Sequence, residues 1–341
     1  SKHLHLVLSP ITTFLKDFEL ARIRPLDFEK EEFGALKLKD LSAHTALGAM
    51  TCVECGRCYD HCPARHTGKL LDPKKLMLDL RDGFIKDPEQ AIVGATIDEQ
   101  ILWQCTTCGA CTFQCPVGID QVVPILEARR GMTAEGNVPH TFNTFFGNLE
   151  RLQNPWAYPT PQAHEFITEN KYPEYNGQEW LYWMGCLARF DMTYRKVSLA
   201  FKAILDRSNT SYGVLKDEQC TGDAARRAGN EFLFQQLAAA NIEMLKATGV
   251  KKIVATCPHC VRTISEYKDI GLDPGVEIIH HSQLINDLVG SGRITLSRET
   301  EAATVYHDPC YLSRYGQPSD IDNPRELLGN PLEPSRTKEK S

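Results

Sequence analysis

Two runs of four cysteines lie close together in the first half of the chain. The first, CVECGRCYDHCP, contains Cys52, Cys55, Cys58 and Cys62. The second, CTTCGACTFQCP, contains Cys105, Cys108, Cys111 and Cys115. Both follow the spacing C-x2-C-x2-C-x3-C-P, by which proteins with two [4Fe–4S] clusters supply thiolate ligands. The spacing therefore predicts two such clusters.

The position of the fourth cysteine in each run predicts an exchange of ligands. Three cysteines spaced three apart can surround one face of a cubane, whereas the cysteine before the proline points toward the other cluster. We therefore assign the first cluster to Cys52, Cys55, Cys58 and Cys115, and the second to Cys62, Cys105, Cys108 and Cys111. Gly56 and Gly109 fit the close approach of backbone to a cluster. Zinc ribbons use paired CxxC units and match poorly. Clusters that exchange ligands lie close together, which predicts an electron relay.

A second group of cysteines follows in the other half of the chain. It consists of Cys186, Cys220, Cys257 and Cys260, with Cys310 further on. A buried, inert cysteine would explain any one of them alone. The close pair in CPHC is instead typical of a metal or redox site. We expect the first four to bind a metal together, either as a third iron–sulfur cluster or as a zinc site.

Hydrophobic periodicity divides the chain into parts of different character. Residues 43–135 hold both cysteine runs, and the segments 71–84, 98–105 and 118–132 have the pattern of helices. This predicts an all-helical ferredoxin domain with two clusters. We expect residues 1–42 to pack on this domain or to lie near a membrane, and residues 136–178 to form an ordered connector with turns.

The part from residue 179 onward predicts an α/β domain. Short apolar runs that read as strands lie at 180–186, 212–215, 251–257, 276–281 and 303–310. Residues 226–249 read as one long helix, with Asp223 as N-cap and Gly249 as C-cap. This alternation favours a parallel sheet, so the fold class is α + α/β. Ligands bind at the carboxyl ends of such strands, where Cys186, Cys257 and Cys310 are expected to converge.

Composition and charge exclude several classes of function. The 341 residues carry a net charge of −6 and no basic run, which argues against nucleic acid as a partner. Thirteen cysteines without the pattern of a secretory signal predict a reducing compartment. No apolar run is long enough to span a membrane. Residues 3–20 have apolar residues at helical spacing, as expected of a packing helix or of a segment that leaves a membrane domain absent from this sequence.

The order of the cysteines in the second half resembles that of a known family. A lone cysteine, then Cys-Cys-Gly, then CxxC is the motif of the cysteine-rich "CCG" domain of heterodisulfide-reductase-like iron–sulfur oxidoreductases. Here Cys186 matches the lone cysteine, Cys220 stands in the Cys-Cys-Gly, and Cys257 and Cys260 match the CxxC. The resemblance covers residues 43–341.

The chain departs from the family pattern in two ways. The Cys-Cys-Gly reads Cys220-Thr221-Gly222, so one thiolate is missing and a non-cubane cluster is in doubt. The family repeats the motif, and Cys310 in HDPC resembles the start of the second copy. The chain ends at RTKEKS, where the next Cys-Cys-Gly is expected, so we interpret the sequence as truncated and the second motif as incomplete.

The stretches SKHLHLVL, CTGDAARRAGNEFLFQ and YHDPCYLSRYG resemble a membrane-bound branch of the family. This resemblance implies electron transfer between electron-transferring flavoprotein and menaquinone, at the cytoplasmic face of the cell membrane. It also implies haem b in a membrane domain that is absent here. No G-x-G-x-x-G follows a strand, so flavin or nicotinamide chemistry is expected in a partner.

Other functions stay open on the sequence alone. The family also includes heterodisulfide and thiol reductases and iron–sulfur subunits of 2-hydroxy-acid and glycerol-3-phosphate dehydrogenases. A scaffold with structural zinc is a further alternative. We interpret His259, His280, His281 and His307 as hydrogen-bonded structural groups rather than ligands. Arg226 and Arg227 could offset the negative charge of a cluster or face solvent.

Overall fold

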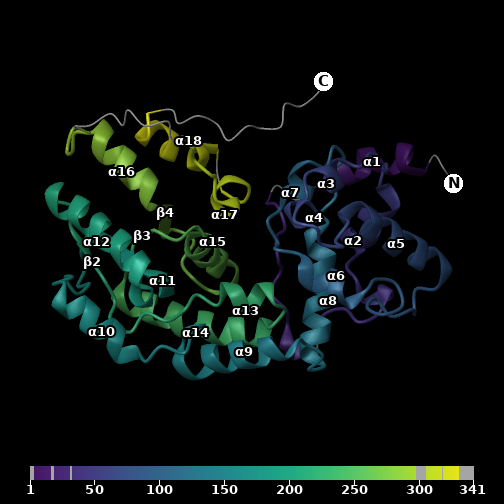
Figure 1. Cartoon of the computed structure of the whole chain (residues 1–341), viewed down its shortest axis with the longest axis horizontal. Helices are drawn as coiled ribbons and strands as arrows, with labels where there is room; N and C mark the ends of the chain where they lie inside the picture. The colour runs from purple at the N-terminus through teal and green to yellow at the C-terminus, as the bar shows by residue number, and fades with distance from the viewer. Residues whose placement is uncertain (1–3, 17–18, 31–32, 297–304, 317, 330–341) are drawn as a thin grey trace. The chain divides into compact units, whose positions relative to one another are not determined.

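The computed structural model describes residues 4–16, 19–30, 33–296, 305–316 and 318–329 (Figure 1). The opening residues 1–3 and the closing segment RTKEKS, residues 336–341, lie outside this description. The chain folds into two compact units. One unit combines residues 1–143 with 224–232, and the other combines 144–223 with 233–341. The short segment 224–232 therefore belongs to the first unit although it lies far along the chain.

The first unit is built from helices. They are α1 (Leu4–Phe14), α2 (Ala43–Thr51), α3 (Arg57–Asp60), α4 (Pro63–His66), α5 (Pro73–Lys86), α6 (Glu99–Gln104), α7 (Ala110–Phe113) and α8 (Val122–Ala134). The helices expected over 71–84, 98–105 and 118–132 are confirmed as α5, α6 and α8. Asp72 and Asp98 cap α5 and α6 by accepting backbone N–H groups of the first turn. Leu38, Leu80 and Leu102 are fully buried in the core of this unit.

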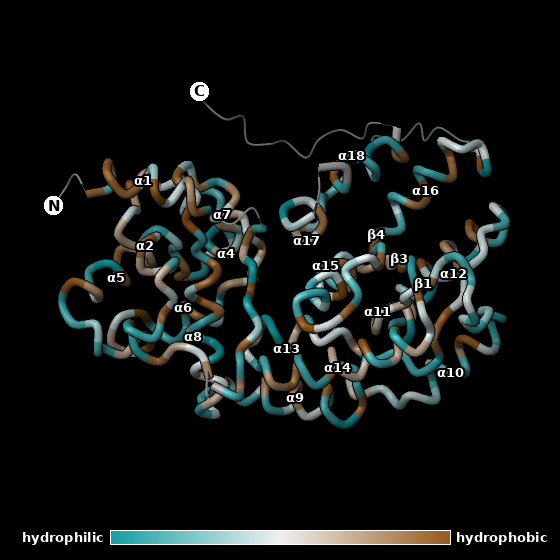
Figure 2. Tube along the Cα trace, turned by 180° about the vertical axis from the view of Figure 1, so that it is seen from behind, coloured by the Kyte–Doolittle hydropathy of each residue, from teal (hydrophilic) through white to brown (hydrophobic). Residues whose placement is uncertain are grey.

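Helix α1 confirms the helical pattern near the start of the chain and packs on α2. Thr12 contacts Thr51 between these helices through a hydroxyl hydrogen bond of 2.7 Å. Hydrophobic residues recur along α1 (Figure 2), and several are exposed, with 87 % of the Phe14 side chain and 67 % of Val7 accessible. Among the helices in the described ranges, none has the length and apolar character needed to cross a membrane.

The second unit contains a small parallel sheet. Its strands are β1 (Trp180–Trp183), β2 (Tyr212–Gly213), β3 (Lys252–Ala255) and β4 (Glu277–His280), in the order β2-β1-β3-β4. All pairings are parallel, as expected, with Leu181 opposite Gly213 and Ile253. Four of the expected strands are thus confirmed. The fifth, over 303–310, is not a strand in its described part, because only Val305 is in a β-bridge, residues 306–309 are irregular and α17 (Cys310–Ser313) begins at Cys310.

Helices surround this sheet, with α15 (Pro258–Glu266) and α16 (His281–Gly290) in contact with β3 and β4 (Figure 1). The unit also contains α11 (Gly185–Phe190), α12 (Met192–Arg207) and α18 (Pro318–Leu327). Tyr182, Val254 and Phe201 are buried in its core. Short loops between strands and helices place the start of α11 and α15 at the carboxyl ends of β1 and β3.

The segment expected to be a connector of turns contains two helices. They are α9 (His140–Leu152) and α10 (Thr160–Glu169). The part between them is a turn, where the Asn154 side chain accepts the backbone N–H groups of Trp156 and Tyr158 and donates to the Tyr158 carbonyl. The prolines concentrated at 155–161 obscured the apolar periodicity of both flanking helices, so this expectation is wrong.

A glycine breaks the helix that the sequence predicted over 226–249. The structure has α13 (Asp223–Arg227) and α14 (Glu231–Thr248) instead. Gly229 between them has φ +90°, and a Cβ there would lie 2.4 Å from the Arg129 carbonyl carbon. Only glycine tolerates both the conformation and the contact. The predicted end of the helix is confirmed, because Gly249 adopts φ +63° directly after α14.

Buried charges hold the segment 224–232 in the first unit. Arg130 of α8 donates to the Glu231 carboxylate at 2.6 Å, and Arg226 approaches the same oxygen at 3.3 Å. Arg226 also donates to the carbonyl of Ile23 at 2.8 Å. The three charged side chains are each at most 6 % exposed. Such a network is stable only while both signs of charge are present, since a buried charge without compensation is costly.

We therefore expect Glu231→Gln to destabilise the chain by about 3–5 kcal/mol, because two buried guanidinium groups lose their shared negative charge. The free energy of unfolding can be measured by anaerobic denaturant titration. Glu243→Gln is the matched control, since it makes the same change at an exposed position of α14. Equal stability of the two variants would contradict this role of Glu231.

Candidate metal centres

The two cysteine runs adopt the same backbone conformation. In each run the second residue after the first cysteine has a positive φ, +58° at Glu54 and +53° at Thr107. The glycine after the second cysteine follows, with φ +84° at Gly56 and +71° at Gly109. Each glycine precedes a one-turn helix, α3 or α7, and these two helices contact each other. The repeated sequence is therefore a repeated structure, with two loops that face one another.

The side chains of the two runs surround two separate cavities. One cavity is lined by Cys52, Cys55, Cys58 and Cys115. The other is lined by Cys62, Cys105, Cys108 and Cys111. The structure thus brings together the two sets that we assigned to the two clusters, each with one cysteine from the opposite run. Cys62 directly precedes α4, and Cys115 directly precedes Pro116.

The electrostatics of the two cavities agree with this grouping. Burial raises the pKa of the Cys58 thiol to about 12, and the neighbouring Cys52, Cys115 and Cys55 raise it further. Burial also raises the pKa of Cys105, where Arg129 acts in the opposite direction and Cys62 raises it again. Several buried thiols around one space are unfavourable as thiolates unless a positive group compensates them, which is what a metal centre provides.

Backbone N–H groups are directed at the sulfur atoms. The amide of Thr107 donates to Cys105 Sγ at 3.3 Å, and the amide of Ile119 donates to Cys115 Sγ at 3.3 Å. Such bonds stabilise a thiolate ligand and adjust the potential of a cluster. Within the described part of the chain, no group of three or more His, Cys, Asp or Glu side chains is arranged for a single metal ion. Four thiols around each cavity match the four ligands of a [4Fe–4S] cluster.

The cysteines of the second unit converge beside its sheet. Cys186 lies in α11 after β1, Cys220 follows β2, and Cys257 precedes α15 after β3. The charges of Cys220 and Cys257 act on Cys186, and those of Cys257, Cys186 and Cys220 act on Cys260. A Cβ on Gly185 would lie 3.1 Å from Cys260 Sγ, so the backbone approaches this group closely. The structure therefore gathers all four at the carboxyl ends of the strands.

One of these thiols, that of Cys257, loses its proton more readily than an ordinary cysteine. A hydrogen bond from the Cys260 thiol lowers the pKa of Cys257 to about 6, and the backbone N–H groups of Cys260 and His259 add to this effect. These amides belong to the first turn of α15, where the free N–H groups and the helix dipole favour a negative charge. Cys257 therefore has the character of a metal ligand in the chain itself.

Glu218 supports the loop that carries Cys186. Its carboxylate accepts the backbone N–H groups of Gly185 at 2.6 Å and Met184 at 2.9 Å. Arg189 donates to the backbone carbonyls of Glu218 and Lys216. Burial raises the pKa of Glu218 to about 7, against the effect of Arg189. The sequence reasoning missed Glu218, Arg189 and Arg129, because a single charged residue carries no pattern that distinguishes a buried supporting group from a surface one.

Thr221 and Cys310 differ from the four gathered cysteines. Thr221, which stands in the place of a second adjacent cysteine, is buried, and its carbonyl accepts the hydroxyl of Tyr267 at 2.8 Å. Cys310 is half-buried on α17, which packs on α15, and Arg314 donates to its sulfur at 3.1 Å.

The histidines singled out by the sequence occupy different environments. His259 Nδ1 lies 2.7 Å from the Asp223 carboxylate, and its ring stacks on Tyr311 at 3.9 Å. His307 is exposed. His280 is buried, and its ring nitrogens lie within hydrogen-bond distance of the Ser282 hydroxyl, the His281 ring and the Thr256 carbonyl oxygen, which accepts. Arg226 and Arg227 are buried in the first unit, so a solvent-facing position is wrong for both.

The adjacent imidazoles of His280 and His281 make the second unit sensitive to acid. Burial lowers the pKa of His280 to about 3 and that of His281 to about 4, below the value of about 6.5 in an unfolded chain. Between pH 6.5 and 4 the unfolded chain binds more protons than the folded chain, so stability falls as the pH falls through this window.

We expect His281→Gln to flatten this dependence of stability on pH, as measured by denaturant titration at a series of pH values. An unchanged slope in the variant would contradict it.

Comparisons with known proteins agree with the two groups of cysteines. Residues 48–119 match the family model of a 4Fe-4S dicluster domain. Residues 180–265 match that of a cysteine-rich domain, CCG. The dicluster match shows that the cofactors of the first unit are [4Fe–4S] clusters, and the cysteine-rich match indicates a further iron–sulfur site. No solved structure gives a significant match.

Curated relatives extend over most of this chain. A probable iron–sulfur-binding oxidoreductase of Bacillus subtilis is 31 % identical over 96 % of this chain and 54 % of its own length. An EtfAB:quinone oxidoreductase of Syntrophomonas wolfei is 31 % identical over 91 % of this chain and 49 % of its own. One subunit of the dihydromethanophenazine:CoB–CoM heterodisulfide reductase of Methanosarcina barkeri is 28 % identical, with 82 % and 73 % covered.

The chain spans about half the length of the first two of these relatives. All three combine similarity to both cysteine-bearing parts of the chain with names that denote redox proteins. The resemblance found in the sequence is thereby confirmed: this chain joins a 4Fe-4S dicluster domain to a cysteine-rich CCG domain, and it is homologous to EtfAB:quinone oxidoreductase and to the matched part of heterodisulfide reductase.

Proposed function

We propose that this chain is the iron–sulfur electron-transfer part of a quinone-linked oxidoreductase. Electrons pass through two [4Fe–4S] clusters of an all-helical ferredoxin domain and exchange with the cysteine-rich site. Cys52, Cys55, Cys58 and Cys115 hold the first cluster, and Cys62, Cys105, Cys108 and Cys111 hold the second. Cys186, Cys220, Cys257 and Cys260 hold the metal of the cysteine-rich site. The clusters carry the electrons, and the protein sets their position and potential.

One observation carries this proposal: each cavity takes three cysteines from one run and one from the other. The facing helices α3 and α7 hold the runs together, so both cavities must lie in the same small body. Two redox centres built on shared loops are suited to pass electrons between them. A structural role would not require two such centres side by side.

At the cysteine-rich site the residues favour an electron terminal over a reductase of disulfides. A fifth thiolate would suit the more open cluster of the family, but Thr221 is buried in its place. The four remaining thiolates match the number of ligands of a closed [4Fe–4S] cluster. We infer a third cubane, with zinc at this site as the outcome that metal analysis would reveal.

The partners follow from the relatives rather than from this chain alone. One relative is named an EtfAB:quinone oxidoreductase. By homology we propose electron-transferring flavoprotein as the donor and a membrane quinone, reached through a membrane domain or subunit, as the acceptor. The corresponding place of action is the cytoplasmic face of the cell membrane, with this part of the protein bound peripherally.

Paired substitutions test the exchange of ligands. We expect about twelve irons in the unaltered chain, about eight in the double variant Cys52→Ala with Cys115→Ala, and about four in Cys52→Ala with Cys62→Ala, because the first pair serves one cluster and the second pair serves two. Iron and zinc are measured in anaerobically purified protein. If each run instead ligated its own cluster, the two double variants would exchange their iron contents. About eight irons and one zinc in the unaltered chain would place zinc at the cysteine-rich site.

The relay is tested by electron transfer from a flavoprotein. Anaerobic mixing with reduced electron-transferring flavoprotein should bleach the visible absorbance of the clusters, since the reduced flavin donates one electron at a time. The double variant Cys52→Ala with Cys115→Ala, which keeps its second cluster by the iron assay, should lose rapid reduction. Rapid reoxidation of the reduced clusters by a heterodisulfide, in a single turnover, would instead support a disulfide reductase.

A further inference from the structure

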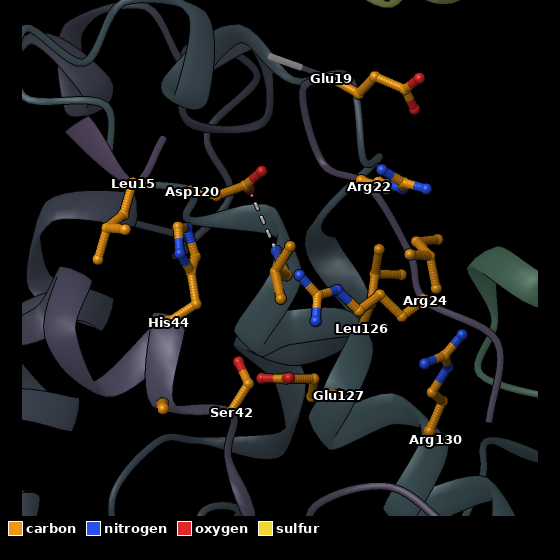
Figure 3. Close-up of a pocket in the computed structure, with 13 residues that line it drawn as sticks. Leu15, Glu19, Arg22, Arg24, Ser42, His44, Asp120, Leu126, Glu127 and Arg130 are labelled. Carbon is orange, nitrogen blue, oxygen red and sulfur yellow. Dashed lines mark hydrogen bonds between the residues drawn. The ribbon is translucent and has the colours of Figure 1, made fainter. Parts of the chain in front are cut away.

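A pocket of about 360 Å³ lies within the first unit, apart from the cavities lined by the cysteines. Three parts of the chain form it: Leu15 with residues 19–24, the start of α2, and one face of α8. Its volume is in the range of sites for small molecules. Figure 3 shows Arg22, Arg24 and Arg130 along one side of the pocket, with Ser42 and His44 along the opposite side.

One part of the lining is apolar. It consists of Leu15, Ile23, Ala43, Val123 and Leu126. Ile23 and Leu126 are fully or almost fully buried, whereas 54 % of Leu15 is exposed at the end of α1. The apolar part of the lining therefore reaches the surface at Leu15, directly after α1. A ligand that fits it has an apolar body.

The other part of the lining offers hydrogen-bond donors. Arg130 is 5 % exposed, and its Nε, unlike the end that binds Glu231, has no hydrogen-bond partner in the described chain. Arg24 is exposed and forms no ion pair within the described ranges. His44 faces them from α2. A buried guanidinium atom without a partner is costly, and a bound acceptor would satisfy it.

The carboxylates at the pocket are occupied by the protein. Asp120 accepts the backbone N–H groups of Ala21 at 2.6 Å and Val122 at 2.9 Å, and the Thr112 hydroxyl at 3.0 Å. Glu127 accepts the Thr45 hydroxyl at 2.9 Å. The exposed Glu19 also has a partner within the chain. The hydrogen-bonding capacity left for a ligand is therefore mainly that of the N–H donors on the positively charged arginine side chains.

We propose that this pocket binds a phosphate group carried on an apolar body. Guanidinium groups from two separate elements suit a group with several acceptor oxygens and more than one negative charge, which a phosphate monoester provides better than a single carboxylate. The apolar lining receives the attached carbon chain. Such a group can belong to a soluble phosphate ester or to an anionic phospholipid, whose acyl chains would meet the exposed residues of α1.

The test uses the full chain with its clusters and three soluble probes. Calorimetric titration with hexyl phosphate should show binding, whereas hexanol and inorganic phosphate should bind at least about tenfold more weakly, since each lacks one half of the recognised structure. Sedimentation with phosphatidylcholine vesicles, with and without phosphatidic acid, separates the two sources. Capture by phosphatidic acid supports a lipid ligand, and binding of hexyl phosphate without capture supports a soluble one.

Two variants and a control connect binding to the pocket. Arg24→Gln should weaken binding about tenfold, and Val123→Phe should abolish it by filling the space. Lys69→Gln makes the same loss of charge at an exposed site elsewhere in this unit and should leave binding unchanged. Iron content and visible absorbance verify that each variant is folded. The proposal is overturned if hexyl phosphate binds no tighter than hexanol and no vesicles are captured, or if Arg24→Gln and Lys69→Gln bind alike.

Discussion

The carboxylate of Glu231 is the point on which the arrangement of the chain depends. It neutralises two guanidinium groups, those of Arg130 and Arg226, that are removed from water. The cost of removing these charges from water is compensated only while opposite charges lie together. The segment 224–232 therefore cannot separate from α8 without leaving all three charges uncompensated. The same segment begins three residues after Thr221, in the loop that carries Cys220. The covalent chain thus passes from Cys220 of the second unit directly into the segment 224–232 of the first.

A second arginine of α8 acts on the chemistry of the clusters. Arg129 is 5 % exposed and donates to the carbonyls of Leu102 and Cys105 at 2.7 Å. Its charge counteracts the effect of burial on Cys105. At the other cavity the corresponding cation is Arg81, which is partly exposed and pairs with Glu54 and Asp82.

This difference makes the two cavities electrostatically unequal. A buried positive charge stabilises the more negative, reduced state of a cluster, whereas a solvated and paired one does so weakly. Asp120 opposes Arg129 on the side of Cys111. In the cluster assignment that we propose, these two charges contribute in opposite directions to how strongly the second cluster attracts an electron.

The sequence predicted the parts of the fold that depend on local patterns. The helices α5, α6 and α8 and the strands β1 to β4 follow from periodicity, and the eight cysteines of the first unit follow from spacing. The break at Gly229 could not be predicted, because the backbone of Arg129 that packs against this glycine lies a hundred residues away in the sequence. Prolines around residue 157 concealed α9 and α10 for a different reason, since they mark turns without showing what lies on either side.

The residues that support the sites could not be predicted from the sequence either. Glu218 and Arg129 act through backbone atoms that only folding brings to them, and the donors of the pocket at Arg24 and Arg130 come from segments that no motif connects. Residue types and spacing therefore identified the ligand candidates. The charged groups that shift the pKa values of these ligands could be identified only from the tertiary structure.

The repeated positive φ values of the cysteine loops have a consequence of their own. Glu54 and Thr107 both occupy a conformation that is unfavourable for residues with a side chain, at the same position of the two runs. The two loops therefore share a backbone conformation at these positions, and they differ in their side chains and surroundings. A contrast in spectrum or potential between clusters held by these two loops would therefore reflect their side chains and surroundings rather than their backbone conformation.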